Sequence, residues 1–174
     1  RVVAGAQDLS VPSSPRSTLT VARWGGGRSI NAIPQEAWLE VDLRSEGAGA
    51  LQALEQGLLE ICTRETECAE AASREEGRRL ELAVEELGRR PSGSTDPSHP
   101  LVGAAMQATR AVGVDPQLGA SSTDANVPMA LGIPALTLGV GGVGGGIHTL
   151  EEWYRNEGGS KGVLRALLTL LLLG

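Results

Sequence analysis

The sequence has no phenylalanine, one tyrosine and three tryptophans, so aromatic side chains supply little of its apolar volume. A core must therefore be built from leucine, valine, isoleucine and alanine, within an apolar content of 41% that is sufficient for a packed domain. Basic residues are also scarce: 15 stand against 21 acidic residues, giving a net charge of −6. Because no run of basic residues is interleaved with aromatics, the sequence disfavours nucleic acid as a partner.

Cysteine is limited to Cys62 and Cys68, which lie six residues apart in a stretch with a helical pattern. Six residues turn about 240° around a helix, so the two thiols point to different faces. This spacing disfavours a disulfide and a CxxC-type metal site, and reduced thiols in a cytoplasmic protein are expected.

Long apolar runs and a secretory signal are both missing. The most apolar segment, Val163–Leu173, is only about half as long as a membrane span requires, and it predicts a terminal helix buried on the body of the protein. The chain opens RVVAGAQ, without methionine and without the basic-then-apolar layout of a signal peptide, so we expect it to be the interior of a longer polypeptide. At 174 residues it can form one ordinary domain or two small ones.

The first half predicts helices and antiparallel strands. Arg1–Ala6 reads as the tail of a helix, residues 18–24 and 37–44 alternate with period two as strands do, and apolar residues recur at helical spacing from Ala48 to about Glu76. Leu80–Leu87 can be a third strand or a continuation of that helix, and we favour the strand because RRPSGSTDP follows directly. One face of the second strand is expected to carry Trp38, Glu40, Asp42 and Arg44.

The second half follows a proline-rich boundary at Arg89–Pro100 and predicts an α/β order. A helix over Leu101–Val112 is followed by a buried strand at Ile133–Gly139, a glycine run, and a helix opened by Ile147-His148-Thr149. A segment with one clear strand cannot form a buried parallel sheet by itself, so we expect this segment to complete a sheet whose other strands come from other residues. We therefore predict two domains, residues 1–90 and 91–174, the first a partial ferredoxin-like two-layer α+β unit and the second α/β.

Several motifs could have either a functional or a structural role. Gly139–Gly144 fits GxGxxG, but no later strand with an acidic residue follows, so a flexible wall close to a ligand is favoured over a dinucleotide site. His148 would lie at the carboxyl end of a strand, where α/β sheets bind ligands, and it is either a metal ligand or a structural histidine. Asp124 is a candidate helix cap for Ala125–Leu131, and His99 is expected to be exposed and without a role. Glu151 and Glu152 suit the first turn of a helix.

Three strings together carry a more specific resemblance: SINAIPQEAWLEVDLRS, SSTDANVPMALGIPALTLG and GGGIHTLEEWY. They resemble the zinc peptidases and amidohydrolases of metallopeptidase family twenty, the group of aminoacylase, peptidase T, carnosine dipeptidase, glutamate carboxypeptidase and succinyl-diaminopimelate desuccinylase. The resemblance covers essentially the whole chain. It implies that residues 1–90 are most of a lid that mediates homodimerisation and that residues 91–174 are the carboxy-terminal part of a zinc-peptidase α/β catalytic domain. It also implies hydrolysis of an amide bond in a small peptide or N-acyl amino acid by metal-activated water, with two zinc ions, or cobalt or manganese, as cofactor.

The resemblance assigns roles by position. His148 matches the last metal ligand, and a neutral imidazole suits zinc. Asn31 and Arg44 match lid residues that hold the carboxylate or amide oxygen of the substrate, a task for which the planar fork of arginine is suited. The remaining matches are a loop facing the metals, Ser122, Thr123 and Asp124, and a turn lining the pocket, Gly144 and Gly145 with Gly146.

The sequence departs from the family in what it lacks. The His-x-Asp motif, the Glu-Glu pair with the general base, the next Asp ligand and the lid histidine are absent, and one histidine cannot hold a catalytic zinc that needs three protein ligands. We therefore expect the His-x-Asp motif, the Glu-Glu pair and the next Asp ligand upstream of residue 1, and we expect the chain alone to be inactive, with no catalytic residue of its own. The alternative is a non-catalytic dimerisation or interaction module.

Overall fold

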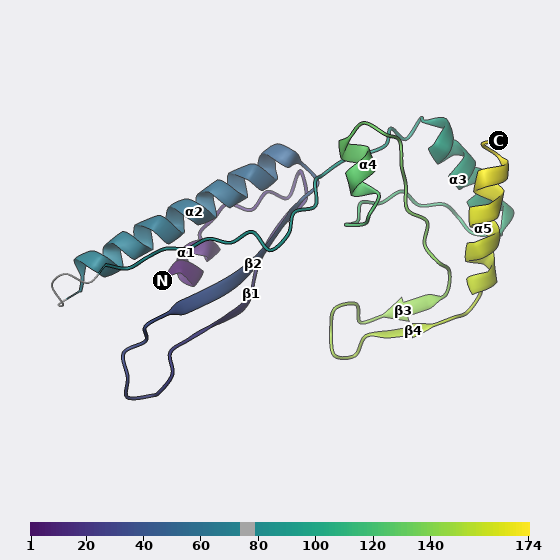
Figure 1. Ribbon diagram of the computed structural model, residues 1–174. Helices are drawn as coiled ribbons and strands as arrows, with labels where there is room; N and C mark the ends of the chain where they lie inside the picture. Colours follow the sequence, from purple (N-terminus) through teal and green to yellow (C-terminus); the bar gives the residue numbers. More distant parts are fainter. Residues whose placement is uncertain (74–78) are drawn as a thin grey trace. The chain divides into compact units, whose positions relative to one another are not determined.

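A computed structural model describes residues 1–73 and 79–174 (Figure 1). The chain divides into two compact units, residues 1–89 and 90–174, which we describe separately. Within the described residues, helices are combined with two small antiparallel sheets of two strands each. This mixture confirms the α+β character predicted for the chain.

The described part of the first unit contains two helices and a hairpin, in the order α1 (Val2–Gln7), β1 (Ser17–Gly26), β2 (Ala37–Ser45) and α2 (Ala48–Ala71). The two strands pair antiparallel, as predicted, with Val21 opposite Val41, and a register shift follows Val21. Helix α2 contacts both strands. Trp38 and Arg44 of β2 are exposed, which places polar and aromatic side chains on the open side of the hairpin.

Close packing of α1 on α2 forms the small core of this unit. Ala6 of α1 is buried with Leu54 and Ile61 of α2. A Cβ atom placed on Gly5 would lie 2.9 Å from Cγ2 of Ile61, so the helices approach closely at a residue without a side chain. The helix tail predicted at the start of the chain is confirmed.

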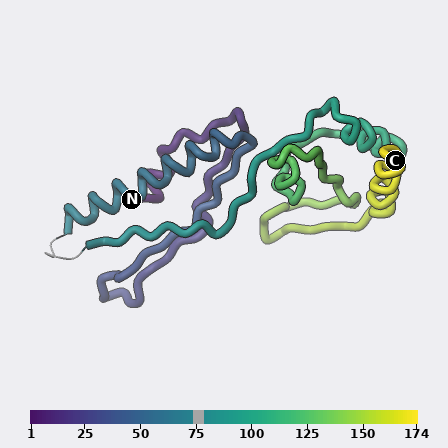
Figure 2. Tube along the Cα trace, turned by 45° about the horizontal axis from the view of Figure 1, so that its top comes forward, coloured from purple at the N-terminus to yellow at the C-terminus, as the bar shows by residue number. Residues whose placement is uncertain are grey.

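The predicted third strand at Leu80–Leu87 is not formed. Residues 79–89 are extended but unpaired, and they run back along α2 (Figures 1 and 2). The backbone N–H of Leu80 donates to the carboxylate of Glu70 at 2.7 Å, and Arg89 donates to Glu55 at 2.9 Å. The segment is therefore fixed to α2 by side chains and has no ladder partner. The predicted helix to Glu76 ends at Ala71, and its last expected residues lie outside the described part.

The second unit is built from three helices and a short hairpin: α3 (Pro100–Ala111), α4 (Asn126–Ala130), β3 (Val143–Gly145), β4 (Trp153–Arg155) and α5 (Gly159–Leu171). Helix α3, close to its predicted bounds, packs on α5, and its small side chains permit close approach. Ala108 is completely buried, with Ala104 and Ala105 nearly so.

The predicted strand at Ile133–Gly139 is wrong, because this extended stretch pairs with no other strand among the described residues. A strand needs a neighbour for its backbone groups. At Ala135 the hydroxyl of Thr95 replaces a neighbouring strand as the hydrogen-bond partner. It donates to the carbonyl oxygen of Ala135 at 2.5 Å and accepts from the N–H of Ala135 at 2.9 Å. No parallel sheet occurs in residues 1–73 and 79–174.

The helix predicted to open at Ile147-His148-Thr149 is also wrong. This segment is the turn between β3 and β4, which pair antiparallel. Gly146 and His148 both have φ near +64°, the left-handed region, which ends any right-handed helix at those residues. Glu151 and Glu152 therefore occupy a turn and not a first helical turn.

The terminal helix α5 begins at Gly159 and is not buried as expected. Its buried residues are Gly162 and Thr169, while Val163 is 73% exposed and Leu170 is 69% exposed. An apolar groove of about 450 Å³ lies between Leu101, the segment around Leu136 and the residues of α5 near Leu170. Among the described residues, no helix combines the length and apolar character needed to cross a bilayer.

Candidate functional site

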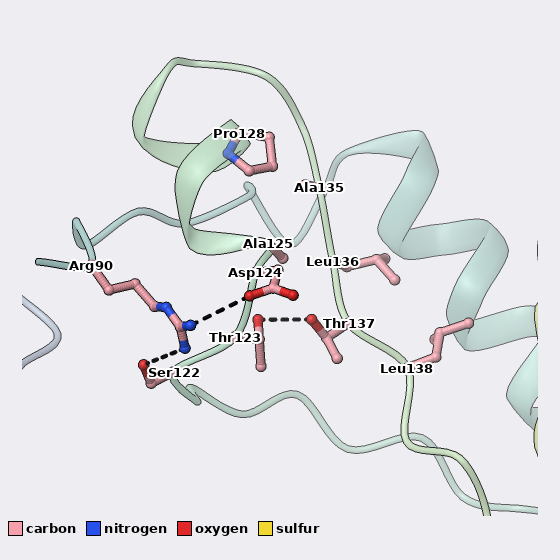
Figure 3. Close-up of a pocket in the computed structure, with 10 residues that line it drawn as sticks. All are labelled: Arg90, Ser122, Thr123, Asp124, Ala125, Pro128, Ala135, Leu136, Thr137 and Leu138. Carbon is pink, nitrogen blue, oxygen red and sulfur yellow. Dashed lines mark hydrogen bonds and ion pairs between the residues drawn. The ribbon is translucent and has the colours of Figure 1, made fainter. Parts of the chain in front are cut away.

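An open pocket of about 730 Å³ lies in the second unit, between the loop before α4 and the extended stretch that follows it (Figure 3). The loop of SSTDAN, predicted to face a ligand, forms one wall. The lining residues are Arg90, Ser122, Thr123, Asp124, Ala125, Pro128, Ala135, Leu136, Thr137 and Leu138.

The polar side of the pocket is joined by hydrogen bonds that converge from three segments. Arg90 donates to the hydroxyl of Ser122 at 3.2 Å and to the carboxylate of Asp124 at 3.4 Å, while Thr137 donates to Thr123 at 2.8 Å (Figure 3). The Asp124 side chain is fully exposed, so its ion pair with Arg90 contributes little to stability. A guanidinium, a carboxylate and hydroxyls beside leucine side chains are the mixture found in small-ligand sites.

Asn126 fixes the loop that carries these groups. Its side-chain oxygen accepts from the N–H of Thr123 at 2.8 Å, and its amide donates to the carbonyl oxygen of Pro91 at 3.2 Å. The predicted capping role of Asp124 is wrong, because the N-cap of α4 is Ala125 and no side chain caps it. Asp124 instead lines the pocket, where its carboxylate pairs with Arg90.

His148 is at the exposed turn between β3 and β4 and does not line the pocket. Its backbone N–H donates to the carboxylate of Glu152 at 3.2 Å. Gly144 and Gly145 are also away from the pocket, since they lie in β3 opposite Tyr154 and Trp153. The structure therefore does not bring the predicted metal ligand and the substrate loop together.

The two predicted substrate residues of the first unit lie apart from each other. Asn31 is in the loop that joins β1 to β2, where its side-chain oxygen accepts from Ser29 at 2.6 Å. Arg44 is near the far end of β2, opposite Thr18, and its guanidinium binds Asp42 at 2.5 Å. More than half of the Arg44 side chain is exposed, which leaves donors available to a ligand.

A zinc centre is not assembled by the described residues. Nowhere in residues 1–73 and 79–174 do three His, Cys, Asp or Glu side chains gather to hold a metal ion. A catalytic zinc takes three protein ligands, so His148 is one candidate ligand and not a site. Cys62 and Cys68 are free thiols, and burial raises the pKa of the Cys62 thiol.

Three roles were missed from the sequence. Arg90 and Thr137 belong to the pocket, yet they lie in segments whose patterns indicated a linker and a buried strand. His99 is half-buried and caps α3, because its Nδ1 accepts from the N–H of Leu101 at 3.2 Å. The proline that follows His99 was the available signal, since proline is favoured in the first turn of a helix.

Comparison with known families gives one match. Residues 3–68 match the family described as the peptidase dimerisation domain. The matched stretch begins in α1, includes the whole β1–β2 hairpin and ends within α2. No curated protein matches the chain.

Proposed function

We propose that this chain, whose residues 3–68 belong to the peptidase dimerisation domain family, is part of a zinc-dependent, homodimeric enzyme that hydrolyses an amide bond in a peptide or N-acyl amino acid. The family match over α1, β1, β2 and α2 is the observation that carries this proposal. The first unit would associate with a second copy, and the second unit would contribute to the catalytic domain.

The pocket of the second unit supports a role in substrate binding. Ser122 and Thr123 offer hydroxyls to the polar groups of an amide, and Arg90 offers a cation to a carboxylate. Leu136 and Leu138 supply apolar surface for a side chain of the substrate. In the first unit, Asn31 and Arg44 are proposed to hold the substrate carboxylate or amide oxygen.

Among the described residues, His148 is the one that we propose as a zinc ligand. Its imidazole would supply one ligand, and the other ligands would come from residues other than those described here. The chain by itself should therefore be inactive. A cytoplasmic location belongs to the same proposal, because both cysteines are free thiols.

Metal content and hydrolysis test the proposal directly. We would compare this chain with a longer form of the protein by elemental analysis and with a panel of dipeptides and N-acyl amino acids. We expect about two zinc ions and turnover in the longer form only, and loss of both in its His148→Ala variant. A longer form that is metal-free and inactive on the whole panel would overturn the proposal.

The second candidate is a non-catalytic dimerisation module. It is favoured by the apolar side chains that the first unit exposes, since Trp24 is 76% exposed, Ile33 is 79% exposed and Ile30 is fully exposed. A metal-free, inactive protein that still forms a stable dimer would be the expected result for this candidate.

A further inference from the structure

The turn between β3 and β4 holds His148 in an unusual backbone conformation. His148 has φ of 64° and is the only non-glycine residue with positive φ in the described part of the chain. Residues other than glycine rarely adopt this conformation, and those that do are held there by their surroundings. The neighbouring contacts should therefore show what holds His148.

Two side chains organise this turn. Thr149 donates its hydroxyl to the carbonyl oxygen of Gly146 at 2.7 Å and accepts from the N–H of Glu151 at 3.2 Å, which closes the turn on itself. Glu152 reaches back four residues, and its Oε2 accepts from the backbone N–H of His148 at 3.2 Å. Glu152 is thus the side chain that bonds the strained residue itself.

The imidazole of His148 has no such restraint. Neither ring nitrogen has a hydrogen-bond partner among the residues that the structure describes. The direction in which the ring leaves the turn therefore depends on the backbone of His148, and that backbone depends on its neighbours. A histidine that binds a ligand benefits when its backbone is already held, because less conformational freedom is lost on binding.

We propose that Glu152 is a positioning residue for His148: its carboxylate holds the His148 backbone in the left-handed conformation and so fixes the direction of the Cα–Cβ bond that carries the imidazole. The role of that imidazole as a metal ligand rests on the proposed function, whereas the positioning itself does not. Glu151 provides a matched control, because it has the same charge in the same turn and its side chain has no partner among the described residues.

The test compares Glu152→Ala, Glu152→Gln and Glu151→Ala in the 174-residue chain by NMR, without metal. In Glu152→Ala we expect the His148 amide to exchange with solvent about tenfold faster and its backbone coupling constant to leave the left-handed range. Glu152→Gln keeps an oxygen acceptor and should restore both readouts. Glu151→Ala should match the parent chain.

Two results would overturn the inference. One is an unchanged His148 amide and coupling constant in Glu152→Ala. The other is equal loss of protection at Gly144 in β3, because Glu152 would then stabilise the whole hairpin and not the residue that it bonds. Neither result bears on zinc, so failure of this inference is distinct from failure of the metal test on the longer protein.

Discussion

Thr95 and Ala135 are joined by two hydrogen bonds, although 40 residues separate them in the sequence. The Thr95 hydroxyl donates to the carbonyl oxygen of Ala135 and accepts from its N–H. One side chain thus satisfies both backbone groups of a residue in the extended stretch beside the pocket. This contact fixes the wall formed by Leu136 and Thr137 relative to the segment that precedes α3.

Removal of the Thr95 hydroxyl should destabilise the second unit. Thr95→Val keeps the shape of the side chain and leaves two part-buried backbone groups of Ala135 without a partner, at a cost of about 1–2 kcal/mol in the free energy of unfolding. Urea denaturation followed by circular dichroism measures this cost. Thr95→Ser keeps the hydroxyl and should lose less than half as much. Equal loss in both variants would contradict the assignment, because Thr95→Ser retains the hydroxyl that makes both hydrogen bonds.

The first unit shows which sequence signals were sufficient. Period-two alternation identified β1 and β2, because Val21 and Val41 meet across one face of a hairpin that local residues close. The string around Asn31 and Arg44 carried the resemblance, which the family match over residues 3–68 confirms for this part of the chain. Helix α2 was found from the spacing of its buried residues Leu54 and Ile61.

In the second unit, the same kinds of sequence pattern were not sufficient to predict the structure. Apolar periodicity at Ile133–Gly139 indicates a buried strand, but a strand also needs a neighbour, and the only bonds at Ala135 come from a side chain. A helix at His148 was excluded by its positive φ, which no pattern in the sequence reports. Arg90 could not be assigned to the pocket because its partner Asp124 is 34 residues away. The metal role of His148 stays a prediction.

Acidification should weaken the turn that precedes α3. The hydroxyl and the backbone N–H of Ser98 both donate to Asp96, and these bonds lower the pKa of Asp96 from its ordinary value of 3.8. The stabilisation is complete above pH 3.8, where the carboxylate is ionised in the folded and unfolded states, and is lost as the pH falls through the lower folded pKa. Titration of the carboxyl carbon by NMR measures this directly. Ser98→Ala should raise the pKa, and an unchanged titration would contradict the assignment.

Residues 3–68 match a peptidase dimerisation domain, so we expect the chain to form a dimer in solution. Light scattering on the purified chain should give twice the monomer mass of 18.0 kDa. Ile30 and Ile33 are highly exposed in the loop of the β1–β2 hairpin, so a double Ile30→Ser, Ile33→Ser variant should shift the equilibrium towards monomer. Leu118→Ser provides the control, because Leu118 is 60% exposed but lies outside the matched domain. A parent chain that is monomeric at high concentration would refute the expectation.

Substitution of Arg44 tests its proposed contact with a substrate carboxylate. In the longer, active form, Arg44→Lys retains the charge and loses the planar fork, so the KM for a carboxylate-bearing substrate should rise about tenfold or more with a smaller change in kcat. Arg23→Lys is the matched control, because Arg23 also sits on the β1–β2 hairpin and pairs with a carboxylate, that of Glu40. An equal effect of both substitutions would assign Arg44 a structural role.

Two helical glycines in the second unit should respond to alanine with opposite signs. Gly103 in α3 has open space around its Cα, so Gly103→Ala should stabilise the fold by about 0.5–1 kcal/mol through helix propensity. Gly162 in α5 is buried, and a Cβ atom there would lie 2.1 Å from the carbonyl oxygen of Val140. Because that oxygen belongs to the backbone, it cannot rotate away as a side chain would.

Gly162→Ala should therefore destabilise the unit by about 1–3 kcal/mol, the usual cost of an overpacked contact, despite the better helix propensity of alanine. Urea denaturation of both variants gives the two free energies. If the two substitutions change the free energy of unfolding in opposite directions, α5 packs against the segment at Val140, which leads into the glycine run and the His148 turn. Stabilisation by both substitutions would mean that α5 does not pack on Val140 in solution, and the position of the β3–β4 hairpin beside it would then have to be revised.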